Sequence, residues 1–247
     1  MSEGGPNDSV SQQRLRTRSR TVVLRHALNS GRKRRFDALL AQLAVLYEDL
    51  RIEILAVAEE SISKLDVLDP QGEDLDHPER AGAYRRHYFL RRSIGTLCEI
   101  ATAIGHLDSD PDFQLIRATG GFEGFAKQTW DGAVEFFRTN ESLIKKIRND
   151  VGGHFGETAA RHAIESFDSD TVGSIEVVFD QDGDPSDPRL HFAKSVVAAA
   201  IFRHLPGDQE EQFKQLMSEV IIKGYQQARD CVQVLTGIYL WPRFGRS

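Results

Sequence analysis

The feature that most constrains this fold is a repeated spacing of apolar residues by three and four positions. It is clearest after residue 35, where the apolar positions are Phe36, Leu39, Leu40, Leu43, Leu46, Tyr47, Leu50, Ile54 and Val57. Such spacing places side chains on one face of an α-helix. The positions between them include charged residues such as Asp49 and Arg51, which suit a face toward water. The pattern predicts one long helix from Phe36 to about Lys64.

The same helical spacing recurs along most of the remaining chain. It predicts further helices over about 80–106, 122–147, 152–165, 196–201 and 213–238. The prolines, glycine and acidic residues of 65–80 predict a polar loop, and Asp108–Pro111 predicts a turn. Because long amphipathic helices with short connections pack antiparallel, we expect a helical bundle.

One segment departs from the helical spacing. Residues 174–179 and 189–192 flank a turn-rich run, 180–188, and this order predicts a β-hairpin at about 173–193. The predicted fold class is therefore mainly α, an antiparallel helical bundle with one small inserted β-hairpin. No internal repeat is visible, and residues 32–247 are predicted to form a single domain.

Composition narrows the class of protein. Of the 247 residues, 40% are hydrophobic and 28% are charged, as in ordinary soluble domains. No apolar run approaches the roughly 20 residues that span a bilayer, and the N-terminus has no signal-peptide core. We therefore expect a cytoplasmic protein without membrane contact. Cys98 and Cys231 both fall at apolar helix positions, which predicts buried free thiols.

Residues 1–31 form a segment of different composition. Its start is rich in glycine, serine, asparagine and glutamine, with almost nothing to bury, which predicts a disordered leader. The leader is basic, with arginines at Arg14, Arg16, Arg18, Arg20 and Arg25. The net charge of −6 argues against nucleic-acid binding across the whole surface. The leader itself would neutralise phosphates of a nucleic acid, or it is a solvated tail.

Patterns typical of metal and phosphate sites are incomplete. Residues 120–124 lack the preceding strand and the lysine of a phosphate-binding loop. The aspartates around Gly183 depart from EF-hand spacing, which favours an aspartate-rich turn. His154 and His162 stand about 12 Å apart along a regular helix, too far to share one ion. We expect neither a metal nor a cofactor.

The remaining candidate for chemistry is the stretch from Arg148 to His154. Arg148 and Asn149 precede the histidine, and Gly152 and Gly153 stand between. In an uninterrupted helix the six-residue offset is about 600°, which leaves the arginine and histidine some 120° apart. A break at the glycines would let both side chains point into one cleft, or let another backbone approach closely. Alternatively, the glycines end one helix, His154 caps or supports the next, and Arg148 pairs with an acid.

Arg148, Asn149 and His154 match the R-x4-6-H signature of HEPN domains, in which a polar residue commonly follows the arginine. The chain resembles this family over about 80–165, where the motif falls at a junction between predicted bundle helices. The predicted hairpin and the long C-terminal helix are not parts of a minimal HEPN bundle. The resemblance implies a metal-independent ribonuclease whose site is composed at a homodimer interface. Many members are toxin-like or phage-defence nucleases, and others are inactive binding modules.

The three motif residues suit RNA cleavage. His154 would take a proton from a ribose 2′-hydroxyl or supply one to the leaving oxygen, because histidine titrates near neutrality. Arg148 would stabilise the charge that builds on the phosphate, and Asn149 would orient or bond it. The arginine-rich leader would help to hold RNA. The alternative function is a non-catalytic helical interaction or regulatory protein with a protein partner, in which Arg148 is paired and buried.

Overall fold

The computed structural model describes residues 34–62, 77–119, 122–152, 155–169, 171, 175–179, 185–190, 192–240 and 242. Most of these residues are helical, which confirms the predicted mainly α class. Among the described helices, none is both long and apolar enough to cross a membrane. The predicted leader, residues 1–31 with its five arginines, lies outside the described residues.

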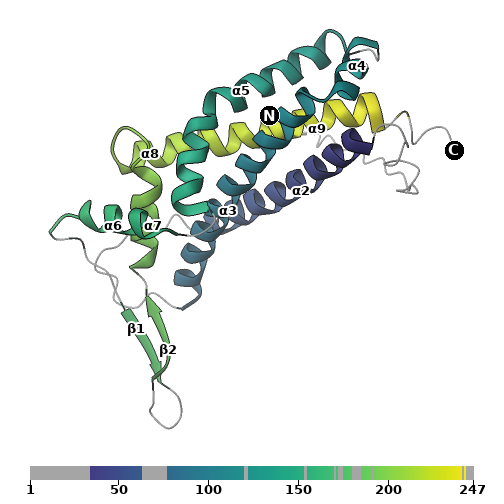
Figure 1. Cartoon of the computed structure of the whole chain (residues 1–247). Coiled ribbons are helices and arrows are strands. Elements are labelled where there is room, and N and C mark those ends of the chain that lie inside the picture. The colour runs from purple at the N-terminus through teal and green to yellow at the C-terminus, as the bar shows by residue number, and fades with distance from the viewer. Residues whose placement is uncertain are drawn as a thin grey trace, which may run out of the picture.

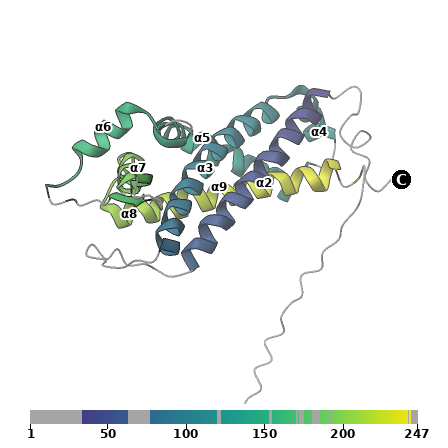
Figure 2. The ribbon, with the colours of Figure 1, turned by 90° about the horizontal axis from the view of Figure 1, so that it is seen from below.

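Two long helices form one side of the bundle. Helix α2 (Arg34–Ile62) and helix α3 (His77–Asp108) lie antiparallel and side by side (Figures 1 and 2). Six of the predicted apolar positions of α2 are buried: Phe36, Leu40, Leu43, Leu46, Leu50 and Val57. Most of the predicted polar loop, 65–80, lies outside the described residues, but its last four residues already belong to α3. For residues 77–79 the loop prediction was wrong, since the helix that was predicted from about residue 80 begins three residues earlier.

A short helix that the sequence analysis did not predict follows α3. Helix α4 (Pro111–Thr119) begins where only a turn was expected. The Asp110 carboxylate accepts hydrogen bonds from the backbone N–H groups of Asp112 (3.0 Å) and Phe113 (3.2 Å), and Pro111 is the first helical residue. An aspartate followed by proline is a common helix start, because the side chain satisfies free N–H groups and proline has none to satisfy.

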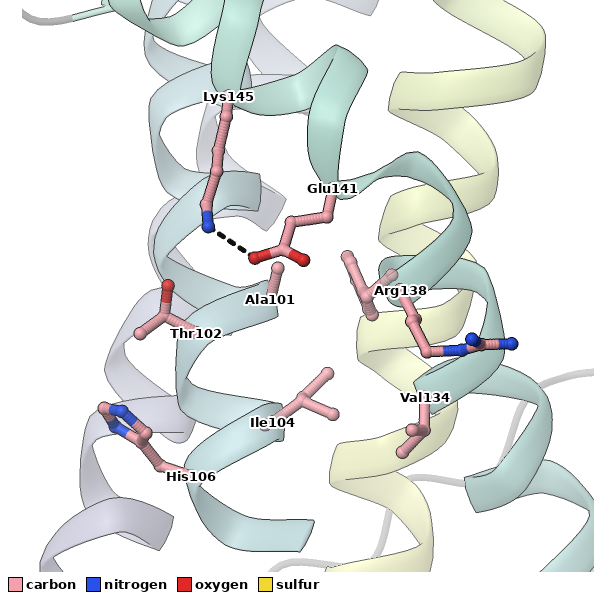
Figure 3. A pocket seen from close by; sticks show the side chains of 10 residues that line it. Ala101, Thr102, Ile104, His106, Val134, Arg138, Glu141 and Lys145 are labelled. Carbon is pink, nitrogen blue, oxygen red and sulfur yellow. Dashed lines mark hydrogen bonds and ion pairs between the residues drawn. The ribbon is translucent and has the colours of Figure 1, made fainter. Parts of the chain in front are cut away.

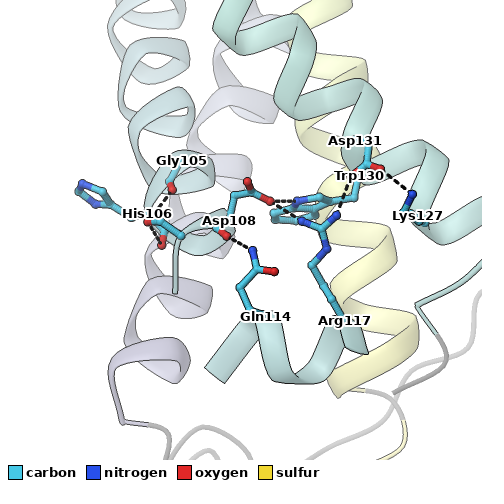
Figure 4. Close-up of polar contacts among 9 residues, drawn as sticks. Gly105, His106, Asp108, Gln114, Arg117, Lys127, Trp130 and Asp131 are labelled. Carbon is cyan, nitrogen blue, oxygen red and sulfur yellow. Dashed lines mark hydrogen bonds and ion pairs between the residues drawn. The ribbon is translucent and has the colours of Figure 1, made fainter. Parts of the chain in front are cut away.

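A polar network fixes α4 to its neighbours (Figure 4). Asp108 Oδ1 accepts hydrogen bonds from Arg117 Nη1 at 2.6 Å and from Trp130 Nε1 at 2.8 Å. Arg117 also pairs with Asp131 at 2.7 Å, and its guanidinium lies 5.4 Å from the centre of the Phe122 ring. The network ties the end of α3 and α4 to the first turns of helix α5 (Phe125–Ile147).

Helix α5 lies against α3 and helix α9 (Lys223–Leu235), as Figure 1 shows. Its buried residues recur at helical spacing: Trp130, Ala133, Phe137, Ile144 and Ile147. The chain continues directly into a π-helical turn, η1 (Arg148–Gly152). A helix was predicted to begin at the glycine pair, but helix α6 begins only at Glu157 and ends at Glu165. Its N-cap residue, Gly156, is extended, so the helical path is interrupted between η1 and α6.

Two strands follow α6. Strand β1 (Ile175–Phe179) pairs antiparallel with strand β2 (Pro185–Leu190), with Ile175 opposite Leu190 and an irregularity after Val178. Proline cannot donate to a ladder, which is tolerated in an edge strand such as β2. Residues 180–184 lie outside the described residues, so the predicted hairpin turn stays a prediction.

The C-terminal part of the chain is helical again. Helix α7 (Ala193–Phe202) packs against α6 and η1. After it come helix α8 (Gln209–Gln215), the π-helical segment η2 (Leu216–Ile222), α9 and the π-helical turn η3 (Thr236–Leu240). The hydroxyl of Tyr239 in η3 donates a hydrogen bond of 2.8 Å to Asp37 in α2. Buried side chains from Phe36 to Tyr239 form one apolar cluster. The hydrogen bond between Tyr239 and Asp37 therefore joins the first and last helical segments of this cluster.

Candidate functional site

The site is built around the turn η1, which is set by the apolar pattern of α5. Ile147 and Val151 are both fully buried and stand four positions apart, so they fix one side of the turn against the core. Arg148 and Asn149 lie between them and are exposed. Within the described part of the chain, neither side chain has a hydrogen bond or an ion pair. The turn therefore offers a free guanidinium and a free amide to solvent.

Helix α3 holds the C-terminal part of the turn through a hydrogen bond to its backbone. Arg91 Nε donates a hydrogen bond of 2.7 Å to the carbonyl oxygen of Val151. The last carbonyl groups of a helix have no partner within the helix, and a cation there also suits the negative end of the helix dipole. Arg91 therefore stabilises η1 where regular helix ends. π-helical turns within helices occur frequently at functional sites.

The opposite side of the turn is held by three charged or polar residues, Asp150, Arg203 and His204, which we name the Asp150 clasp. Asp150 Oδ2 lies 2.8 Å from Arg203 Nε and 2.5 Å from Arg203 Nη2, and it also contacts His204 Nε2. The three side chains are only 16–18% exposed. Charge-assisted hydrogen bonds at such partial burial are among the stronger polar contacts in proteins. The clasp joins η1 to the end of α7.

The hydrogen-bond directions within the clasp follow from its chemistry. His204 Nε2 is within reach of both the Asp150 oxygen and Arg203 Nε. A carboxylate only accepts hydrogen bonds and a guanidinium only donates them. Because Arg203 Nε already donates to Asp150, His204 Nε2–H donating to Asp150 satisfies all three groups. Asp150 is two positions beyond Arg148, so the two side chains leave the helical turn in roughly opposite directions. The Asp150 clasp therefore contacts the side of the turn that faces away from Arg148.

Arg148 on the exposed side of the turn acts electrostatically on Cys98 of α3. Burial raises the pKa of the Cys98 thiol, and the positive charges of Arg148 and Lys145 oppose that rise. This thiol is free and partly exposed, whereas Cys231 is free and buried. The expectation of burial was correct for Cys231 and wrong for Cys98, because the α3 face that carries Cys98 is only partly covered by α5.

A groove of about 380 Å³ lies between α3 and α5 beside this surface (Figure 3). Its floor is mostly apolar and its rim carries polar and charged side chains. Figure 3 shows Lys145 and Glu141 together, joined by an ion pair, while Arg138 projects away from α3. The residues that line the groove are Ala101, Thr102, Ile104, Gly105, His106, Val134, Phe137, Arg138, Glu141 and Lys145.

Of the predicted site residues, the structure describes Arg148 and Asn149, which lie side by side on η1. His154 lies outside the described residues, as do Arg14, Arg16, Arg18, Arg20 and Arg25. The convergence of Arg148 and His154 stays a prediction. Three residues that sequence reasoning did not assign to the site contact the turn, namely Arg91, Arg203 and His204, and a fourth, Asp150, belongs to the turn itself. Only Asp150 had a sequence signal, since it directly follows Arg148 and Asn149.

Metal-ligating side chains do not gather among the described residues, where no group of three or more histidine, cysteine, aspartate or glutamate side chains forms a site. On α6, His162 is exposed, and Glu157 forms an ion pair of 2.8 Å with Arg161. The polar residues of α6 are thus part of a solvated helix face. This leaves η1 as the candidate functional site.

Comparisons with protein-family models, with curated proteins and with solved structures find no match to this chain.

Proposed function

We propose that this chain is a HEPN-like, metal-independent endoribonuclease that cleaves single-stranded RNA. The observation that supports the proposal best is the state of Arg148. Its guanidinium is exposed and has no partner within the described part of the chain, although the turn that carries it is held from two other sides. An arginine that is presented in this way suits recognition of an anionic ligand better than a role in the core.

The proposed chemistry assigns a role to each motif residue. Arg148 donates hydrogen bonds to the phosphate oxygens on which charge builds during cleavage. Asn149 orients that phosphate from the adjacent exposed position. His154 exchanges the proton of the attacking 2′-hydroxyl or of the leaving oxygen. The Asp150 clasp and Arg91 keep the turn in one geometry, so that the arginine and the amide are arranged before the substrate binds.

The proposal includes a homodimer, since the resemblance implies that two chains compose the site. An exposed apolar stripe on α2 supports such a partner. Val45, Ile52 and Leu55 are 61%, 55% and 47% exposed, and their spacing of seven and three residues puts them on one line along the helix. Exposed apolar side chains that adjoin one another mark contact surfaces for other proteins. The stripe would equally serve the alternative function, a non-catalytic interaction protein.

The finer expectations from the sequence belong to the same proposal. The arginine-rich leader would add phosphate contacts to the bound RNA, and the chain would act in the cytoplasm, in toxin–antitoxin or phage-defence roles. The segment 173–193 would be a hairpin inserted in the bundle.

The test is cleavage of single-stranded RNA by the purified protein in EDTA. We expect the wild type to cleave and His154→Ala to lose about 10²–10⁴-fold of the rate. Arg148→Ala is expected to lose about 10²–10³-fold. The matched controls are His162→Ala and Lys146→Ala, which replace exposed residues of the same kinds and are expected to cleave like the wild type. Far-ultraviolet circular dichroism checks that each variant is folded.

Cleavage that survives in His154→Ala would remove the proposed site. A wild type that is inactive on single-stranded RNA would favour the non-catalytic alternative.

A further inference from the structure

We propose that the groove between α3 and α5 binds an unpaired segment of the RNA strand and leads it to Arg148. The inference rests on the proposed function and extends it from the motif residues to a substrate track, by which we mean the groove between α3 and α5 along which the RNA strand would lie. It is carried by the continuity of one helix face, by the small residues of α3 and by the charges along the rim.

The α5 side of the groove shares its face with Arg148. Arg148 follows the lining residues Lys145, Glu141 and Arg138 by three, seven and ten positions. At about 100° per residue, all three lie within about 80° of its direction around the helix. The groove and the proposed site are therefore neighbouring parts of one surface. The ten residues between Arg138 and Arg148 extend for about 15 Å along the helix axis.

The groove is open on its α3 side because the residues of α3 that line it there are small. Cys98, Ala101, Thr102 and Gly105 recur at three- and four-residue spacing and therefore line one face of α3. Three of them, Ala101, Thr102 and Gly105, line the groove. A Cβ atom placed on Gly105 would meet nothing within 4 Å, so this part of the face is open. Larger side chains at these positions would fill the space between the two helices.

The groove combines an apolar floor with a rim that carries two cations, each paired with a glutamate. Ile104, Val134 and Phe137 contribute apolar lining, and Lys145 and Arg138 lie along the α5 edge. Lys145 pairs with Glu141 and Arg138 pairs with Glu135, but these pairs are more than half exposed. Exposed pairs of this kind hold their partners weakly, so both cations are available to a phosphate, Lys145 beside the groove and Arg138 on the side of α5 that faces away from α3. Arg148 has no carboxylate partner among the described residues.

This combination fits an unpaired nucleic-acid strand. Such a strand carries a negative backbone, which suits the rim, and base faces that are free to lie on an apolar surface. In a duplex the base faces are stacked on one another and cannot reach the floor. Glu141 is the one carboxylate among the lining residues, and it opposes binding. Its removal should therefore tighten the complex.

The test fills the groove without disturbing the fold. Gly105→Leu puts a side chain into the open space, and leucine is a better helix former than glycine. In a helix the leucine side chain leans toward the N-terminal turn, which here means toward Ala101 and Thr102. The matched control is Gly132→Leu, because Gly132 is also helical, also exposed and also open at its Cβ. It lies sixteen positions before Arg148, about 160° away around α5.

Binding is measured by fluorescence anisotropy with a labelled single-stranded 2′-O-methyl oligonucleotide, which cannot be cleaved by attack of a 2′-hydroxyl. We expect Gly105→Leu to bind about tenfold more weakly and Gly132→Leu to bind like the wild type. Glu141→Gln should bind more tightly than the wild type, and the same strand annealed into a duplex should bind more weakly. Thermal unfolding confirms that the variants are folded.

Equal binding by Gly105→Leu and the wild type would overturn the inference, as would a wild type that does not bind the probe or that prefers the duplex. These outcomes differ from failure of the proposed function, which is read from cleavage of unmodified RNA. A protein that cleaves RNA while Gly105→Leu binds normally would retain the proposed site and lose the track. A protein that binds through the groove without cleaving would retain the track and lose the nuclease.

Discussion

Arg203 and Asp150 are 53 positions apart in the sequence, and their side chains meet at 2.8 Å between Nε and Oδ2. The contact joins the end of α7 to the turn that carries Arg148 and Asn149. Both side chains are less than one-fifth exposed, so water competes for them only weakly. The position of the two exposed motif residues therefore depends on a residue from a distant part of the chain.

Replacement of Arg203 tests this dependence. Arg203→Gln removes the charged donor from a carboxylate that stays mostly buried, and we expect a loss of about 1–3 kcal/mol in the free energy of unfolding. Under the proposed function, RNA cleavage should also fall, because the turn is less well held. Urea denaturation measures the first effect and a cleavage assay the second.

The matched control for Arg203 is Arg161→Gln. Arg161 forms an ion pair of 2.8 Å with Glu157, but both of these side chains are well exposed. That variant should lose less than about 1 kcal/mol. An equal loss in the two variants would mean that the Asp150 clasp is no stronger than a surface pair.

Glu53 makes the stability depend on pH. Its side chain is buried between α2 and α3, Thr96 donates a 3.1 Å hydrogen bond to Oε1, and Oε2 has no hydrogen-bond partner. Burial raises the pKa of this carboxyl above its ordinary value of 4.5, against the lowering effects of Thr96 and Arg92. The folded state therefore binds the proton more tightly than the unfolded state. Stability is highest below pH 4.5 for this group and falls as pH rises through the raised pKa.

Glu53→Gln should remove that pH dependence, because the amide is neutral at every pH. We expect the variant to unfold at a higher temperature than the wild type at pH 8, with the difference vanishing near pH 4. Thermal unfolding at the two pH values measures it, and Glu165→Gln serves as the control because Glu165 is an exposed carboxylate on α6. A variant that is less stable than the wild type at pH 8 would show that the ion pair with Arg92 outweighs the cost of burial.

The apolar stripe on α2 can be tested through the oligomeric state. Ile52→Glu puts a charge into the middle of the exposed line, so under the proposed function we expect the proposed homodimer to dissociate at least about tenfold more readily. Sedimentation or light scattering across a concentration series gives the dissociation constant. Leu115→Glu is the control, since Leu115 on α4 is equally exposed at 55%. Dimers that resist Ile52→Glu, or a wild type that stays monomeric, would exclude this stripe as the interface.

Gly224 tests how closely α3 and α9 approach. A Cβ atom at this position would lie 2.7 Å from Cδ2 of Leu97, which is itself fully buried. Gly224→Ala should therefore destabilise the protein by about 1–3 kcal/mol through overpacking, despite the better helix propensity of alanine. Gly237→Ala is the control, because a Cβ there meets nothing within 4 Å. Equal stability of Gly224→Ala and the wild type would mean that Leu97 moves aside at no cost.

Much of the fold could be predicted from local sequence pattern. The apolar positions of α2 and α5 recur at helical spacing, and the structure buries most of them. Helix α4 was missed although Asp110 and Pro111 form a recognisable helix start, so the signal was present in the sequence. Val45, Ile52 and Leu55 lie outside the apolar positions from which helix α2 was predicted, and the structure leaves them exposed. A sequence identifies apolar residues, but which of them are covered depends on what packs against the helix.

The sequence by itself determined most of the helical segments, because the spacing of apolar residues is a local property of the chain. It also picked out Arg148 and Asn149 as neighbours in a polar turn. Only the tertiary structure decided that these two face solvent while Asp150 beside them is held by Arg203 and His204. It likewise brought Arg91 to Val151, 60 positions away. Such partners come from helices that meet only when the bundle packs, and no local pattern records them.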